Sequence, residues 1–147
     1  MGKNGFASTA GVLIGAAYVA VGIIGFAVTG FSNFVQDTDD ALLFGFASVN
    51  PMHNLVHVTI GTFLIFMTTR SGQATAEGAL MGVGIFYVAA FVIGVVAADN
   101  LTIISMNGAA DGENLVHILT GVTALTAGLF SAGQSEAAAR RSGVPVQ

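Results

Sequence analysis

Residues 50–57 of the chain read NPMHNLVH, and residues 114–117 read NLVH. A glycine follows the last histidine of each stretch by four residues, as Gly61 and as Gly121. The second copy lies 60 residues after the first, and such regular self-similarity is the mark of an internal repeat. Each copy opens an apolar run of the roughly 20 residues that a helix needs to cross a bilayer. The pattern therefore predicts a duplicated membrane hairpin.

The composition of the chain also favours a membrane protein. Charged residues make up 8% of the chain and hydrophobic residues 54%, and the mean hydropathy is +0.80, whereas soluble proteins contain about 25% charged residues. Cysteine is absent, which excludes disulfides, thiolate metal ligands and iron–sulfur clusters. With 4 Lys and Arg residues in total, the chain has no basic surface that would bind nucleic acid. We expect one transmembrane domain over residues 1–147.

Four apolar stretches are long enough to span the hydrocarbon core, at about residues 8–30, 51–69, 77–98 and 113–132. A helix satisfies its own backbone hydrogen bonds in lipid, whereas an open strand does not. The fold class that follows is all-α: an integral membrane four-helix bundle built from two parallel two-helix repeats. We expect residues 133–147 to form a cytoplasmic tail.

The loop after the first stretch mixes aromatic and acidic residues, which suits the headgroup level of a membrane. A short interfacial helix is expected near residues 41–46. The acidic cluster before it, Asp37, Asp39 and Asp40, lacks the spacing of a calcium-binding loop and is interpreted as solvated.

The basic residues indicate the orientation. Lys3, Arg70, Arg140 and Arg141 lie before the first stretch, between the second and third, or after the fourth, and loops rich in such residues stay on the cytoplasmic side. The other two loops contain acidic residues but no Lys or Arg. This distribution predicts a multi-pass protein of the cell's inner membrane with both termini in the cytoplasm.

Small residues recur at helical spacing in both halves. Gly78 and Gly82 form one small-xxx-small pair. Such residues let membrane helices approach one another closely, so we predict that they lie at helix contacts. A larger set matches between the first and third stretches: Gly15, Tyr18 and Gly25 against Gly84, Tyr87 and Gly94.

Polar side chains share one face of the second and of the fourth stretch. They recur at i, i+3, i+4 and i+7, the spacing of a single helix face. Polar groups at membrane depth are unfavourable enough to mark candidate functional sites. Both stripes are expected to face a common axis: Asn50, His53, Asn54 and His57 in the second stretch, and Glu113, Asn114 and His117 in the fourth.

This arrangement resembles the uncharacterised bacterial and archaeal membrane family DUF4383, whose members are short four-helix chains. The resemblance rests on residues 50–57 and on residues 114–117, and it covers nearly the whole chain. Residues 111–114, which read DGEN, depart from the aspartate–asparagine start typical of that family, so the role of Asp111 stays open. The resemblance implies a fold but no activity, substrate or cofactor.

Three interpretations of the polar stripe remain open. In the first, its asparagines and histidines form an interhelical hydrogen-bond network. In the second, His57 and His117 bind a cofactor, with haem between two axial imidazoles and the glycines four residues further on leaving room for the flat ring. In the third, the stripe lines a polar vestibule for protons or a small solute, with His53 and Glu113 near its mouth. No separate metal site is assigned.

Sequence motifs of enzymes do not accompany the histidines. The chain contains no nucleophile elbow, no zinc-protease motif and no phosphate-binding glycine loop, so we expect no enzymatic activity and assign no catalytic residue. By elimination, the sequence indicates a non-enzymatic accessory or structural subunit of a membrane complex. Its expected partners are the lipid bilayer and other membrane subunits, or further copies of itself.

Overall fold

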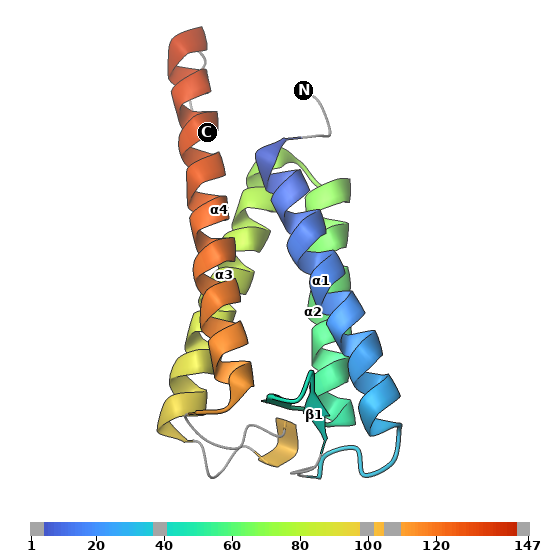
Figure 1. Ribbon diagram of the computed structural model, residues 1–147. Helices are drawn as coiled ribbons and strands as arrows, with labels where there is room; N and C mark the ends of the chain where they lie inside the picture. Colours follow the sequence, from blue (N-terminus) through green and yellow to red (C-terminus); the bar gives the residue numbers. More distant parts are fainter. Residues whose placement is uncertain (1–4, 37–40, 98–101, 105–109, 144–147) are drawn as a thin grey trace.

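Four long helices, running alternately in opposite directions, form the computed structural model of the chain (Figure 1). The structure describes residues 5–36, 41–97, 102–104 and 110–143. The start of the first helix and the end of the last helix lie at the same end of the bundle (Figure 1). The helices are α1 (Phe6–Thr29), α2 (Pro51–Arg70), α3 (Gln73–Val96) and α4 (Gly112–Ser142).

These bounds confirm the all-helical prediction, with differences at two helix ends. Helix α3 begins at Gln73, one turn before the expected start. Helix α4 has 31 residues and continues through Gly133 to Ser142, ten residues beyond the expected end. Gly133 is exposed and does not interrupt the helix, and the following alanine-rich segment has a high helix propensity.

Three of the four helices, α1, α3 and α4, are long and apolar enough to cross a membrane. Helix α2 is not among these three, although its 20 residues would match the bilayer thickness. His53, Asn54 and His57, together with several threonines, make α2 more polar than the other helices. The expectation of four crossings is therefore supported for three helices by length and composition.

The helices associate mainly as two pairs, α1 with α2 and α3 with α4. In the first pair the backbones touch at glycines: a Cβ added at Gly61 would lie 2.5 Å from the carbonyl oxygen of Gly15. In the second pair, a Cβ added at Gly121 would lie 3.1 Å from the carbonyl oxygen of Gly84. These contacts confirm the predicted close packing of small residues.

Gly78 and Gly82, in contrast, were expected at a helix contact and do not lie at one. Both are exposed, and an added Cβ would meet no atom within 4 Å. Helix α3 instead turns Leu80, Val83 and Tyr87 inward, because these larger side chains fill the interior.

A β-hairpin replaces the interfacial helix predicted near residues 41–46. Strand β1 (Leu42–Leu43) pairs antiparallel with β2 (Ala47–Ser48). The reversal takes place at Phe44 and Gly45, whose φ angles are 53° and 80°, in the left-handed region that no right-handed helix contains. Leu43 packs with Val49 and with Val21 of α1, and this burial fixes the hairpin. The acidic cluster of residues 37–40 lies outside the described residues.

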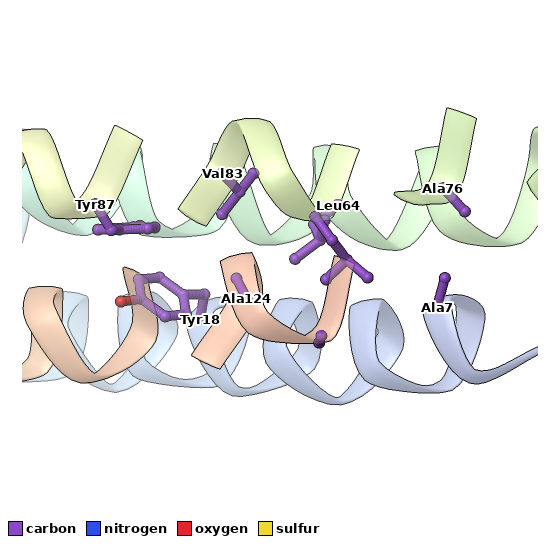
Figure 2. Packing of buried hydrophobic residues seen from close by; sticks show 9 residues of the cluster. Ala7, Tyr18, Leu64, Ala76, Val83, Tyr87 and Ala124 are labelled. Carbon is purple, nitrogen blue, oxygen red and sulfur yellow. The ribbon is translucent and has the colours of Figure 1, made fainter. Parts of the chain in front are cut away.

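The apolar core lies between the two helix pairs. Figure 2 shows its order along the bundle: the rings of Tyr18 and Tyr87 lie at one end of the view, and Ala7 and Ala76 at the other. Between them lie three apolar side chains, Val83, Leu64 and Ala124. The two tyrosine rings are in contact, with centroids 4.8 Å apart.

Candidate metal centre

The polar stripe lies in the interior at the end of the bundle where α2 and α4 begin. Two N-caps define these beginnings. Asn50 accepts a hydrogen bond from the backbone N–H of His53 at 2.8 Å, and Pro51 occupies the first helical position, as predicted. Asp111 caps α4, since it accepts from the backbone N–H of Glu113 at 3.0 Å. The role of Asp111, which the sequence left open, is therefore that of the N-cap of α4.

The seven residues of the stripe are buried, as the common-axis prediction requires. None of these side chains is exposed to lipid on the outer surface of the bundle. Exposed fractions run from 0% to 3% for Asn50, His53, Asn54, His57, Glu113, Asn114 and His117.

Four of these side chains converge on one point. The Nε2 atoms of His53 and His57 lie 3.1 Å apart. The carboxylate Oε2 of Glu113 lies 3.5 Å from the Nε2 of His53, 3.9 Å from that of His57 and 3.7 Å from that of His117. All four residues offer a ligand atom within 4.8 Å of the others. This set of four residues is called the His₃Glu centre below.

Four of the six distances among these ligand atoms are close to those in a metal's coordination sphere, and all six are within 4.8 Å. Ligands bound tetrahedrally at about 2.0–2.1 Å from Zn²⁺ are about 3.3 Å from one another. The distances of 3.1–3.9 Å that link Nε2 and Oε2 atoms in the centre lie around that value. The three distances to Glu113 are longer than the 2.7–3.2 Å typical of an N–H···O hydrogen bond.

The two buried glutamates of the bundle differ in their hydrogen bonds. Glu113 Oε2 has no hydrogen-bond partner among the described residues. Glu77, near the opposite end, accepts at Oε1 from Gln73 at 2.9 Å, from Ser131 at 3.0 Å and from Ser135 at 2.7 Å. A buried charge is tolerated when it is paired or binds a metal. Of the two buried glutamates, Glu113 is the one whose Oε2 lacks a hydrogen-bond donor or a cation among the described residues.

A layer of aromatic rings lies next to the His₃Glu centre. The ring of Tyr18 meets His57 edge-on with centroids 4.9 Å apart, and that of Tyr87 lies 5.2 Å from His117. The Tyr18 hydroxyl donates to Thr120 at 2.8 Å. Both tyrosines belong to the apolar core and lie at one end of it in Figure 2, so their ring contacts join that core to two of the imidazoles.

Asn54, which belongs to the stripe, does not join the centre. Its side-chain amide donates to the hydroxyl of Thr29 on α1 at 3.0 Å. A Cβ added at Gly25 would lie 2.0 Å from Asn54 Oδ1, so Gly25 is what lets α1 pass this side chain. Asn54 therefore works as an interhelical contact, as the first interpretation expected.

The room for haem that the sequence argument placed beside Gly61 and Gly121 is filled. A Cβ at Gly61 would meet Val19 Cγ2 at 2.9 Å, and a Cβ at Gly121 would meet Val88 Cγ2 at 2.8 Å. Both glycines face their partner helix, not a gap between His57 and His117. The residues present do not fit a flat macrocycle at this position.

His53 and Glu113 were predicted at the mouth of a vestibule and not as members of one centre. The repeat contains a signal that would have joined them, because Glu113 follows His53 by the same 60 residues that separate His117 from His57. Within each helix the two residues are spaced i, i+4, the spacing of facing neighbours: His53 with His57, and Glu113 with His117. The sequence indicated the contact of Glu113 with His117 and the match of His57 to His117, but we did not pair His53 with Glu113.

Comparisons with known proteins identify the family and do not indicate an activity. No curated protein and no solved structure matches the chain. A family model described as "Domain of unknown function (DUF4383)" matches residues 8–130. That match covers most of the chain and both stretches with which the sequence argument began, and the chain therefore belongs to the DUF4383 family.

Proposed function

We propose that this protein binds one divalent transition-metal ion in the His₃Glu centre, within a membrane-embedded helical bundle. The observation that carries the proposal is the convergence of four buried ligand atoms, from two helices, within 4.8 Å of one another. His53 and His57 come from the first and second turns of α2, and Glu113 and His117 from those of α4. An ion in this position would link the two helix pairs.

The ligand set defines the class of metal. Imidazole nitrogen suits zinc, iron, nickel and copper, whereas magnesium and calcium prefer oxygen ligands throughout. The chain contains no cysteine, so soft thiolate coordination is not available. A tetrahedral set of three imidazoles and one carboxylate is therefore best matched by Zn²⁺ or by another late first-row divalent ion.

A purely structural hydrogen-bond network is the competing explanation. The 3.1 Å contact between the Nε2 atoms of His53 and His57 is a hydrogen bond if one of the two rings carries its proton on Nε2. If all three rings carry their protons on Nδ1, which has no hydrogen-bond partner among the described residues, three Nε2 lone pairs and a carboxylate oxygen point at the same place. Four acceptors repel one another unless a proton or a cation lies between them. The separations of 3.5, 3.7 and 3.9 Å to Glu113 are long for shared protons and leave space for an ion.

The test begins with protein purified without a polyhistidine tag, which would itself bind metal, and reconstituted in lipid nanodiscs. After loading with Zn²⁺ or Co²⁺ and removal of excess ion, elemental analysis should find about one metal per chain. Bound Co²⁺ should give the strong visible absorption of a tetrahedral site. Glu113→Gln and His57→Ala should lose the ion, whereas Glu77→Gln, a substitution of the other buried glutamate, should retain it.

Metal binding and a purely structural hydrogen-bond network predict different results in this experiment. Wild-type protein that stays metal-free after loading overturns the proposal. So does a Glu113→Gln variant that binds metal as the wild type does. If the centre is a hydrogen-bond network only, His57→Ala should destabilise the bundle by about 0.5–2 kcal/mol without any metal-dependent change.

We also propose that the chain consists of two parallel repeats and that α2 crosses the membrane with the other helices. Equivalent residues make equivalent contacts, since Tyr18 touches His57 as Tyr87 touches His117. Helix α2 runs along the length of α1 (Figure 1), and its polar side chains lie in the interior. A metal centre is compatible with an accessory or structural subunit of a membrane complex, and we propose that role for this protein.

A further inference from the structure

The end of the bundle that contains the His₃Glu centre is covered by two short elements. One is the β1–β2 hairpin, and the other is the 3₁₀ turn η2 (Thr102–Ile104). Both lie at the end where α2 and α4 begin (Figure 1). Residues 41–49 and 102–104 are called the loop cap below.

Asn50 ties the loop cap to a ligand-bearing turn. Its side-chain amide nitrogen donates to the carbonyl of Ile103 at 2.9 Å and to that of Gln36 at 3.2 Å. Its side-chain oxygen accepts from the backbone N–H of His53, which belongs to the centre. One fully buried side chain thus connects the cap to the helix turn that positions a metal ligand.

Asp111 makes the corresponding connection on α4. Its Oδ1 accepts from the backbone N–H of Ser48 in β2 at 3.2 Å and from that of Glu113 at 3.0 Å. The next residue adds a backbone bond, because the N–H of Gly112 donates to the carbonyl of Phe46 at 3.2 Å. The hairpin is therefore anchored within two residues of the carboxylate ligand.

The opposite side of the centre is closed by apolar packing. Beyond the tyrosine layer lie Val83, Leu64 and Ala124 (Figure 2), and the exposed fractions of Leu64 and Ala124 are 1% and 0%. A hydrated ion has no polar ligand in that layer, and the desolvation of a charge in an apolar interior is strongly unfavourable. Entry past the loop cap avoids this apolar layer.

We propose that Asn50 and Asp111 are positioning residues that hold the loop cap closed over the His₃Glu centre, so that metal enters and leaves only through the capped end of the bundle. The statement about metal rests on the proposed function; the closure of the cap stands on the contacts of Asn50 and Asp111. The two residues govern how fast the ion exchanges, not how many ions bind, because neither contributes an atom to the centre.

Substitutions at Asn50 separate the two tasks of its side chain. Asn50→Asp keeps the oxygen that caps α2 but replaces the donor to Ile103 and Gln36 with a second acceptor, which their carbonyls repel. Asp111→Asn is the conservative counterpart, since an asparagine oxygen can still accept from Ser48 and Glu113. Ser135→Ala removes a hydrogen bond at the far end of the bundle and serves as a control.

The first experiment measures release of Zn²⁺ from nanodisc-embedded protein to an excess of chelator. Asn50→Asp should release the ion at least about tenfold faster than the wild type while binding the same number of ions. Asp111→Ala, which removes the acceptor that Asp111→Asn keeps, should also release the ion faster than the wild type, whereas Ser135→Ala should release it at the wild-type rate. Equal release rates for wild type and Asn50→Asp would overturn the inference while leaving the metal centre intact.

The second experiment does not depend on metal. The chain has no cysteine, so a single Val49→Cys variant gives one thiol within the loop cap, at a position that is fully buried. A membrane-impermeant maleimide should label it slowly, and at least about tenfold faster when Asn50→Asp is added. Rapid labelling without Asn50→Asp, or no acceleration with it, would show that Asn50 does not close the cap, whether or not the protein binds metal.

Discussion

At the scale of single residues, the two buried glutamates have opposite roles. Glu77 is held by three donors and stabilises the contact between α3 and α4. Glu113 lies among three imidazoles at 3.5–3.9 Å and gains most from a cation. The same side-chain type therefore serves structure at one end of the bundle and, in our proposal, ligation at the other.

This difference predicts how zinc affects stability. A ligand that binds the folded state stabilises it by about 2.7 kcal/mol when present at 100 times its Kd, so Zn²⁺ should raise the unfolding temperature of the wild type. The rise should vanish in Glu113→Gln and persist in Glu77→Gln. Thermal unfolding in nanodiscs with and without Zn²⁺ measures it, and a rise of equal size in Glu113→Gln would argue against ligation by the carboxylate.

Acidification gives a second prediction at this scale. Imidazole and carboxylate ligands bind a metal only in their deprotonated forms, so protons compete with the ion. The amount of bound Zn²⁺ should therefore fall as the pH is lowered and recover on return to neutral pH. Equilibrium dialysis over a pH series tests this, and metal retention that does not depend on pH would contradict coordination by His₃Glu.

At the scale of helices and strands, glycine contacts decide how the pairs form. Gly61→Ala should destabilise the protein by about 1–3 kcal/mol, as overpacking typically does, because the new Cβ would lie 2.5 Å from the Gly15 carbonyl oxygen. Gly78→Ala is the matched control, since an added Cβ there meets no atom within 4 Å, and it should be neutral or stabilising. Denaturant unfolding of both variants, with similar losses in each, would refute this assignment.

The elements also show what the sequence could and could not predict. The start of α2 follows from Asn50 and Pro51, whose capping preferences act within one turn. The hairpin at residues 41–48 did not follow, because a short apolar run is compatible with helix or strand and Phe44 adopts a positive φ that bulky residues rarely adopt. Tertiary packing of Leu43 decides between the two structures.

The candidate site was predictable only in part, because the repeat spacing is visible in the sequence but the packing of one helix against another is not. The repeat spacing placed His57 and His117 at equal depth, and the structure brings them to one centre. The convergence of His53 and Glu113 on the same point depends on how α2 and α4 are rotated and how closely they approach. That geometry is set by the glycine contacts of each pair and is not visible in either helix alone.

At the scale of the whole molecule, the segregation of Lys and Arg predicts that the capped end of the bundle faces away from the cytoplasm. Single cysteines are introduced into the cysteine-free chain and labelled in intact cells with an impermeant reagent. Reagent from outside should label Asp39→Cys and Gly108→Cys but not Gln73→Cys. Labelling of Gln73→Cys from outside would invert or abolish the proposed topology.

The central claim is that three imidazoles and one carboxylate of this bundle bind a single metal ion. X-ray absorption spectroscopy at the zinc edge, on wild-type protein loaded with one equivalent of Zn²⁺ in nanodiscs, tests it most directly. The account predicts four nitrogen or oxygen ligands at about 2.0–2.1 Å, with the outer-shell scattering of about three imidazoles, and loss of this signal in Glu113→Gln. A six-coordinate shell of oxygen ligands without imidazole scattering, or no retained zinc, would contradict it.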